Sequence, residues 1–197
     1  MDPIKKLIDN NLTNRYLNLD GMHIDAIGAK TLAKWLKTDV IVTDLDLRRN
    51  KIGNRGAQSL ANALMINTSI KIINLESNQI GIQGIIALTE SLKINTYLTE
   101  LYLGNNQIGD KEVCVLAECL KINSTLAILD LNNNRIGIQG SQALAKALKI
   151  NTGVTNLNLR YNQIGDQGTC ALAKTLKTNT TLTILKLESN QISDQGV

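Results

Sequence analysis

Apolar side chains recur along this chain with a strict period of 28 residues. Each copy contains an apolar residue, one variable residue and a leucine, and no insertion separates one copy from the next. Apolar residues at alternate positions are typical of a short β-strand that buries one face. The pairs are Leu17/Leu19, Leu45/Leu47, Ile73/Leu75, Leu101/Leu103, Leu129/Leu131, Leu157/Leu159 and Leu185/Leu187.

An asparagine stands three residues after each of these pairs except the first, where Met22 takes its place. A side-chain amide offers both donors and acceptors, so we expect it to satisfy backbone groups in the turn and on the next coil. These asparagines are Asn50, Asn78, Asn106, Asn134, Asn162 and Asn190.

The second half of each copy predicts a helix. An isoleucine is usually followed by Gly-x-x-Gly and then by Leu-Ala-x-x-Leu, whose two leucines share one helical face. Glu112 and Ser193 interrupt the glycine pattern. Each helix ends on an asparagine, or on Asp39 in the first copy, and we expect there the left-handed backbone that commonly ends a helix. These asparagines are Asn67, Asn95, Asn123, Asn151 and Asn179.

One such unit cannot bury its own apolar face, so neighbouring copies must stack. Adjacent strands lie ~4.8 Å apart, whereas adjacent helices need ~8–10 Å, so the array bends. We therefore predict an α/β solenoid, a horseshoe with a parallel sheet on the concave face and helices on the convex face. Residues 14–197 would form six complete repeats and a partial seventh, and residues 1–13 an N-terminal cap.

The two ends of the array need protection from water. We expect Asp2 to cap a short helix with Pro3 in its first turn, and Trp35 to cover the end of the first repeat. The sequence ends at Val197, midway through a repeat. It predicts either a fragment of a longer protein or an end covered by a partner or by a second copy, which would allow self-association.

The repeated pattern resembles the leucine-rich repeat family. It is similar to the 28-residue ribonuclease-inhibitor-like class, which also occurs in innate immune receptors and in the GTPase activator of Ran. The motif reads Val42-x-x-Leu45-x-Leu47-x-x-Asn50-x-Ile52-Gly53-x-x-Gly56-x-x-x-Leu60-Ala61-x-x-Leu64 and recurs over residues 14–197. The near-identical repeats, rich in Asn, Ile and Lys, also resemble leucine-rich-repeat effectors of intracellular bacteria. The resemblance implies a binding scaffold, and for an effector a place in the host cytoplasm.

Composition and charge narrow the partners only slightly. A net charge of +4 permits nucleic-acid or membrane contact without requiring it. Cys114, Cys119 and Cys170 cannot all pair within one chain, and their helix-like surroundings predict small buried thiols in a reducing compartment. The N-terminus lacks the apolar stretch of a signal peptide, and no run approaches the ~18 apolar residues that span a bilayer. We expect a cytoplasmic protein without membrane contact.

The outward-facing strand residues are the variable positions of this fold. Seven of them are acidic and three are basic, while many of the lysines fall on the predicted helices. Nucleic-acid binders instead cluster Lys and Arg with aromatic residues. The outward positions are Tyr16, Asn18, Asp20, Asp44, Asp46, Arg48, Ile72, Asn74, Glu76, Glu100, Tyr102, Gly104, Ile128, Asp130, Asn132, Asn156, Asn158, Arg160, Ile184, Lys186 and Glu188. We therefore predict a protein partner with a basic patch and no nucleic acid.

Tyr102 is the expected central anchor of the protein-binding site, because tyrosine and arginine are enriched among residues that dominate binding energy. Glu100, Asp130 and Ile128 would flank it. Further candidates come from the neighbouring strands and turns, namely Asp46, Arg48, Arg49, Arg160 and Tyr161.

Catalytic and metal chemistry finds little support in the sequence. The single histidine, His23, stands at a predicted exposed turn. Cys114 and Cys119 are five residues apart on a helix, which is not a metal-ligand spacing. Asp44 and Asp46 share a strand face, and we interpret them as surface rather than as an acid/base pair. The Gly-x-x-Gly turns recur too regularly to be phosphate loops, and no Gly-Lys-Ser/Thr follows them. We expect no enzyme, cofactor or metal, and no glycosylation at the asparagines that end helices.

Two other functions stay open. The Ran activator, which has the same repeat class, uses a positioned arginine near a strand end, and Arg48 and Arg49 occupy a comparable place. The resemblance therefore allows a GTPase activator, in which an arginine would stabilise charge during phosphoryl transfer. The repeats could also be a structural spacer within a longer protein.

Overall fold

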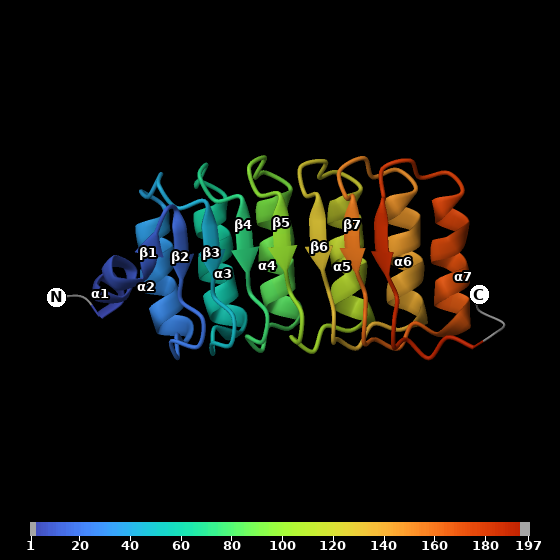
Figure 1. Cartoon of the computed structure of the whole chain (residues 1–197), viewed down its shortest axis with the longest axis horizontal. Helices are drawn as coiled ribbons and strands as arrows, with labels where there is room; N and C mark the ends of the chain where they lie inside the picture. Colours follow the sequence, from blue (N-terminus) through green and yellow to red (C-terminus); the bar gives the residue numbers. More distant parts are fainter. Residues whose placement is uncertain (1–2, 194–197) are drawn as a thin grey trace.

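Residues 3–193 are described by the computed structural model, in which strands and helices alternate along the chain (Figure 1). The strands are β1 (Leu12–Thr13), β2 (Tyr16–Asn18), β3 (Asp44–Asp46), β4 (Ile72–Asn74), β5 (Glu100–Tyr102), β6 (Ile128–Asp130), β7 (Asn156–Asn158) and β8 (Ile184–Lys186). The helices are α1 (Pro3–Asn11), α2 (Ala26–Leu36), α3 (Gly53–Leu64), α4 (Ile82–Leu92), α5 (Asp110–Leu120), α6 (Ile138–Leu148) and α7 (Gly165–Leu176).

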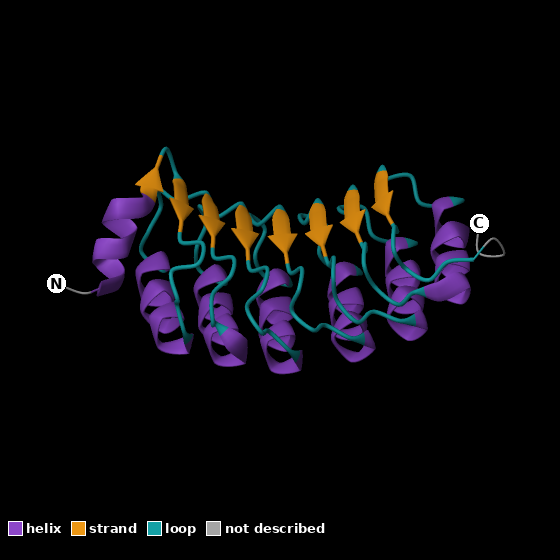
Figure 2. Cartoon of the chain, turned by 60° about the horizontal axis from the view of Figure 1, so that its bottom comes forward, coloured by secondary structure: helices purple, strands orange, loops and turns teal. Residues whose placement is uncertain are grey.

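The eight strands form one sheet in sequence order, and this confirms the predicted α/β solenoid. From β2 to β8 all neighbours are parallel, and each residue pairs with the residue 28 positions later, as Leu45 does with Ile73. Figure 2 shows the array bent into an arc, with the sheet on the inner, concave side and the helices on the outer side. The arc is the predicted horseshoe, since closely spaced strands face more widely spaced helices.

The core lies between the sheet and the helices. The repeated apolar pairs, of which one residue lies in a strand from β2 to β7 and the other directly after it, are at most 1% exposed, and the helix leucines of α2 to α6 are at most 2% exposed. Since every repeat contributes side chains to the same layer, each one completes the core of its neighbours.

The N-terminal segment differs from the repeats. β1 runs antiparallel to β2, pairing Leu12 with Leu17, so the first strand of the array has a hydrogen-bonded neighbour on its outer edge. Trp35 is half-buried and packs against the core at this end. The predicted capping residue Asp2 lies outside the described residues.

The asparagines after the strands form a buried ladder through the molecule. Asn106 Nδ2 donates to the carbonyls of Leu75, Leu103 and Gly104, while its Oδ1 accepts from the backbone N–H groups of Asn78 and Ile80. The predicted role is correct, but its direction is not, because the side chain reaches back to the preceding coil. The first repeat has no preceding coil of this kind, which accounts for its exposed Met22.

The asparagines that end the helices do not have the left-handed backbone that we predicted for them. Asn95 instead acts through its side chain: Nδ2 donates to the Leu64 carbonyl at 2.6 Å, and Oδ1 accepts from the N–H groups of Tyr97 and Leu98 at 2.9 and 2.7 Å. The residues with positive φ lie in the turns after the strands, for example Arg49, Ser77 and Tyr161. Because the amides of Asn67 and Asn123 are buried and bonded in this way, the folded chain does not present these two for glycosylation, whereas Asn179 is half-buried.

Neighbouring helices start in close contact. A Cβ on Gly168 would lie 2.2 Å from Ser141 Oγ of the preceding helix, so only glycine fits there. In α5 this glycine position is occupied by Glu112. Its Oε2 accepts from the Gly109 N–H at 2.9 Å, so Glu112 caps its own helix. Across the repeat boundary, Asp110 Oδ1 accepts from the N–H groups of Gly137 and Gly140.

The cysteines are only partly as predicted. Cys119 is buried, and burial raises the pKa of its thiol to about 11. Cys114 is half-buried and Cys170 is exposed on the outer face of α7, so the expectation of three buried thiols is wrong. Among the described residues, no helix is long and apolar enough to cross a membrane. Within the same residues, no group of His, Cys, Asp and Glu is arranged to hold a metal ion.

Candidate binding site on the concave sheet

The first four parallel strands, β2 to β5, frame a hollow on the concave face. Its volume is about 280 Å³. Tyr16 of β2 lines one side and Tyr102 of β5 the other, with Ile72 and Asn74 of β4 between them. These side chains meet because the parallel register places positions separated by 28 residues side by side. The remaining lining residues are Asp44, Leu45, Asp46 and Arg48.

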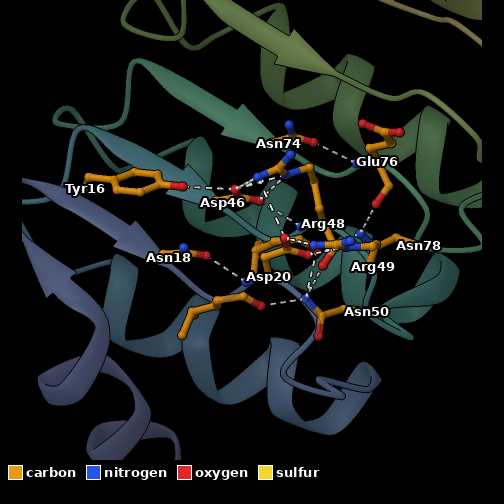
Figure 3. Close-up of polar contacts among 12 residues, drawn as sticks. Tyr16, Asn18, Asp20, Asp46, Arg48, Arg49, Asn50, Asn74, Glu76 and Asn78 are labelled. Carbon is orange, nitrogen blue, oxygen red and sulfur yellow. Dashed lines mark hydrogen bonds and ion pairs between the residues drawn. The ribbon is translucent and has the colours of Figure 1, made fainter.

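Asp46 lies at the floor of this hollow and joins two of its neighbours (Figure 3). Tyr16 Oη donates to Asp46 Oδ2 at 3.0 Å, and Arg48 donates to the same carboxylate from Nε at 3.0 Å and from Nη2 at 2.6 Å. Asp46 is only 5% exposed. Our interpretation of Asp44 and Asp46 as a surface pair is therefore wrong for Asp46, which is a buried, ion-paired group.

The same contacts alter the proton affinity of the hollow's side chains. Partial burial, with the adjacent Asp46 carboxylate, raises the pKa of the Tyr16 phenol. The hydrogen bonds to Asp46 raise the pKa of the Arg48 guanidinium, which stays charged. Both shifts favour the protonated forms, the neutral phenol of Tyr16 and the charged guanidinium of Arg48.

A second ion pair lies below the first, in the turns that follow β2 and β3 (Figure 3). Arg49 Nε donates to Asp20 Oδ1 at 2.8 Å, and Arg48 Nη2 lies 3.7 Å from Asp20 Oδ2. The hydrogen bonds from Arg49 lower the pKa of the Asp20 carboxyl. Both arginines at this position are therefore held by carboxylates of the chain itself.

Tyr102 lies on β5, the middle one of the parallel strands β2 to β8. Its Oη donates to Glu100 Oε2 at 2.6 Å, and burial, followed by that hydrogen bond, raises the pKa of the phenol. Asp130 is its register partner on β6 and accepts from Asn132 Nδ2 at 2.6 Å and from Asn158 Nδ2 at 2.7 Å. Ile72 of β4 and Ile128 of β6 pair with Glu100 of β5 from either side, so apolar and acidic side chains alternate across these three strands.

Negative charge on this face exceeds the positive charge available to balance it. Within the described part of the chain, the ion pairs of the concave face involve only Asp20, Asp46 and Glu188 as acids. Asp44, Glu76, Glu100 and Asp130 therefore have no cationic partner within 4 Å. Because the seven acidic and three basic outward positions give a charge of −4 in a chain of net +4, the rest of the chain carries +8. Much of that charge lies on or just after the helices, at Lys34, Lys146 and Lys174 in last turns and Lys93, Lys121, Lys149 and Lys177 at C-caps.

The predicted site residues fall into two groups. The first group lies on or directly after strands β3, β5 and β6, and comprises Asp46, Arg48, Glu100, Tyr102 and Asp130. By contrast, Arg160 and Tyr161 lie after β7, where Arg160 pairs with Glu188 and Tyr161 is 60% exposed. Tyr16 was not singled out from the sequence, although its register with Asp44 indicates that it shares the same surface.

The fold and this face define a class of protein, an α/β solenoid that presents one strand of each repeat on a concave surface. The Leucine Rich repeat family matches the chain at residues 42–61, 67–88, 95–111, 123–145, 151–173 and 178–197. The chain therefore belongs to the leucine-rich repeat family. No curated protein sequence matches it significantly.

Solved structures resemble the chain at the level of the fold. A structure of leiomodin-1 actin-binding site 2 is 26% identical with a TM-score of 0.60, over 68% of this chain and 78% of that chain. The tropomodulin C-terminal domain of Caenorhabditis elegans is 13% identical with a TM-score of 0.62, over 77% of this chain and 92% of that one. An internalin from Listeria monocytogenes is 24% identical with a TM-score of 0.49, over 84% of this chain and 46% of that chain.

Proposed function

We propose that this protein is a non-catalytic binding module whose concave face binds a basic segment of a protein partner. The observation that supports this proposal is a set of four carboxylates without a cationic partner at outward positions on or directly after β3 to β6, namely Asp44, Glu76, Glu100 and Asp130. A lysine or arginine side chain of the partner would enter the hollow between Tyr16 and Tyr102. There it would gain the attraction of Asp44 and the faces of the aromatic rings.

The architecture also favours a protein partner. A concave sheet offers many outward side chains on a rigid backbone, which suits recognition of an extended surface. The leiomodin-1 structure that resembles this chain is described as an actin-binding site, which is a protein-binding role. Tyr102 with polar groups around it also suits a protein interface, in which aromatic anchors are surrounded by a polar rim.

We also propose a repeat class and a cellular role for the protein. The 28-residue period and one helix per repeat favour the ribonuclease-inhibitor-like class. The near-identical repeats, rich in Asn, Ile and Lys, favour a host-interaction or sensor scaffold of the bacterial effector kind, acting in the host cytoplasm.

The GTPase-activator alternative depends on Arg48 or Arg49 reaching a nucleotide. In the unbound chain Arg48 is held by Asp46, and Arg49 by Asp20. Either arginine would have to leave a carboxylate before it could stabilise transferred phosphate, which adds a cost that a preorganised catalytic arginine avoids. We therefore rank this alternative below protein binding.

Binding to peptides of opposite charge tests the proposed function. We expect lysine- and arginine-rich peptides on an array to bind the protein, and acidic peptides of the same length not to bind. Tyr102→Ala and Asp130→Arg should each weaken binding of the best basic peptide by roughly tenfold or more, about 1.4 kcal/mol, as measured by fluorescence anisotropy.

Lys174→Glu, on the outer face of α7, is the matched control and should leave the affinity unchanged. Equal binding of acidic and basic peptides would contradict the proposal. So would equal losses in the concave variants and the control. Failure of both peptide classes to bind would favour the structural spacer.

A further inference from the structure

A row of exposed apolar side chains lies along one edge of the solenoid, away from the concave face. In four successive repeats an isoleucine follows the C-cap residue of the helix, and these isoleucines, Ile66, Ile94, Ile122 and Ile150, are 58–67% exposed. The row is extended by Val40, Ile41 and Tyr97 in the same turns. We call these seven residues the edge row.

Exposed apolar side chains are concentrated in the edge row. Fifteen large hydrophobic side chains are exposed among the described residues, and seven of them belong to these few turns. Scattered exposed apolar residues need no explanation, but a contiguous set commonly marks an interaction site. The core does not require isoleucine here, because the adjacent helix leucines and the buried asparagine already fill the inner positions.

Positive charge accompanies the edge row. The residue before the exposed isoleucine is Lys93, Lys121 or Lys149 in three repeats, and Lys37 and Lys177 occupy the same place in the first and last. Glu90 and Glu118 pair with Lys93 and Lys121, but these glutamates are 53% and 68% exposed, and such exposed pairs are weak. The edge therefore combines apolar side chains with a net positive charge.

The shape of the molecule makes this edge flat. The array bends about an axis parallel to its strands. The turns at one end of the strands therefore stay near one plane perpendicular to that axis. The turns that lead from each helix to the next strand form one line along the upper edge in Figure 1, whereas Figure 2 shows the bend itself. All repeats can therefore touch one flat surface at the same time.

We propose that this edge docks the protein on an anionic lipid bilayer, with the edge row inserted among the headgroups and the lysines facing acidic lipids. Apolar side chains beside lysines are the pattern of peripheral membrane binding, in which buried apolar area and attraction to anionic lipid add together. A lipid bilayer can accept every protruding side chain of the edge row at once. A protein partner would need a separate cavity for each of these side chains. This proposal replaces the expectation that the protein makes no membrane contact. It leaves the concave face free.

Vesicle co-sedimentation of the full chain tests the proposal. We expect the protein to bind vesicles of phosphatidylcholine with about 30% phosphatidylserine, and to bind pure phosphatidylcholine vesicles at least tenfold more weakly. The double variant Ile94→Ser/Ile122→Ser should lower the partition coefficient by at least about tenfold, because two apolar side chains no longer leave water. Lys149→Gln/Lys177→Gln should lower it about tenfold on the anionic vesicles alone.

Matched control variants lie at the other ends of the helices. Ile27→Ser removes an isoleucine that is 75% exposed in the first turn of α2, and Lys111→Gln removes a lysine in the first turn of α5. Both should partition like the parent protein. Since all the altered side chains are exposed, each variant should keep the parent's circular dichroism and melting temperature, which shows that lost binding is not lost folding.

Several results would overturn the proposal. Absence of binding to the anionic vesicles would do so, as would equal losses in the edge and control variants. A dimer in size-exclusion chromatography that Ile94→Ser/Ile122→Ser dissolves, without vesicle binding, would assign the edge to a second copy of the chain instead.

Discussion

At the residue scale, buried polar side chains bond the backbone groups that the turns leave without a partner. Spacing alone identifies the ladder asparagines, and Asn106 bonds the carbonyls of its own turn as expected, but it reaches the preceding coil rather than the next one. An asparagine such as Asn95 can end a helix through a left-handed backbone or through side-chain hydrogen bonds. Here the side chain forms the hydrogen bonds, and the backbone is not left-handed. Asp39, at the same position in the first repeat, indicates the side-chain role. Its carboxylate accepts from the N–H groups of Ile41 and Val42, and an acceptor is the only part that a carboxylate can supply here.

Asp46 shows why the site itself was harder to predict. Strand alternation places Asp46 outward, which is correct. Its burial depends on Tyr16, which is 30 residues away on the preceding strand, and on the rotamer of Arg48. Sequence spacing fixes the register but not the side-chain directions, so the ring of contacts around Tyr102 was expected while the hollow beside it was not.

Removing one ladder amide should strongly destabilise the fold. Asn106→Ala leaves two backbone N–H groups and three carbonyls in the interior without this partner, so the free energy of unfolding should fall by about 2–4 kcal/mol in urea denaturation. Asn106→Asp should be at least as damaging, because its carboxylate would face three carbonyl oxygens. Asn62→Ala, on the exposed face of α3, is the control and should be neutral or slightly stabilising. A loss under about 0.5 kcal/mol for Asn106→Ala would contradict this role.

At the element scale, each helix depends on its neighbours for its ends. The start of α6 is capped by Asp110 of α5, and the start of α4 by Asn54 of α3, which accepts from the N–H groups of Gly81 and Gly84. The helices themselves were predictable from the leucine spacing. The capping between helices was not, because it joins a first-turn residue to a glycine 27 positions later.

The cap between α5 and α6 can be tested by one substitution. Asp110→Ala removes an acceptor shared by two N–H groups at the start of α6, so we expect a loss of about 1–2 kcal/mol in the free energy of unfolding. Lys111→Ala changes the adjacent exposed residue and should have little effect. Equal stability of the two variants would show that water replaces the Asp110 carboxylate at no cost.

At the scale of the whole molecule, excess negative charge lies on the concave face, away from the edge that carries positive charge and exposed apolar side chains. Carboxylates gather on the concave sheet, lysines at the ends of the helices and exposed isoleucines along one edge. The curvature follows from the difference between strand and helix spacing, so it was predictable from the repeat alone. The edge row escaped prediction because periodic isoleucines look like core residues until the turn that holds them is placed.

The central claim is that excess negative charge on the concave face drives binding, and the salt dependence of affinity tests it most directly. For the best basic peptide, the Kd measured by anisotropy should rise steeply as sodium chloride increases, because exposed charges are screened within a Debye length of about 8–10 Å. The double variant Asp44→Asn/Glu76→Gln should bind more weakly at low salt and respond less to added salt. A Kd that is independent of salt, or a variant with the same salt response as the parent protein, would contradict the account.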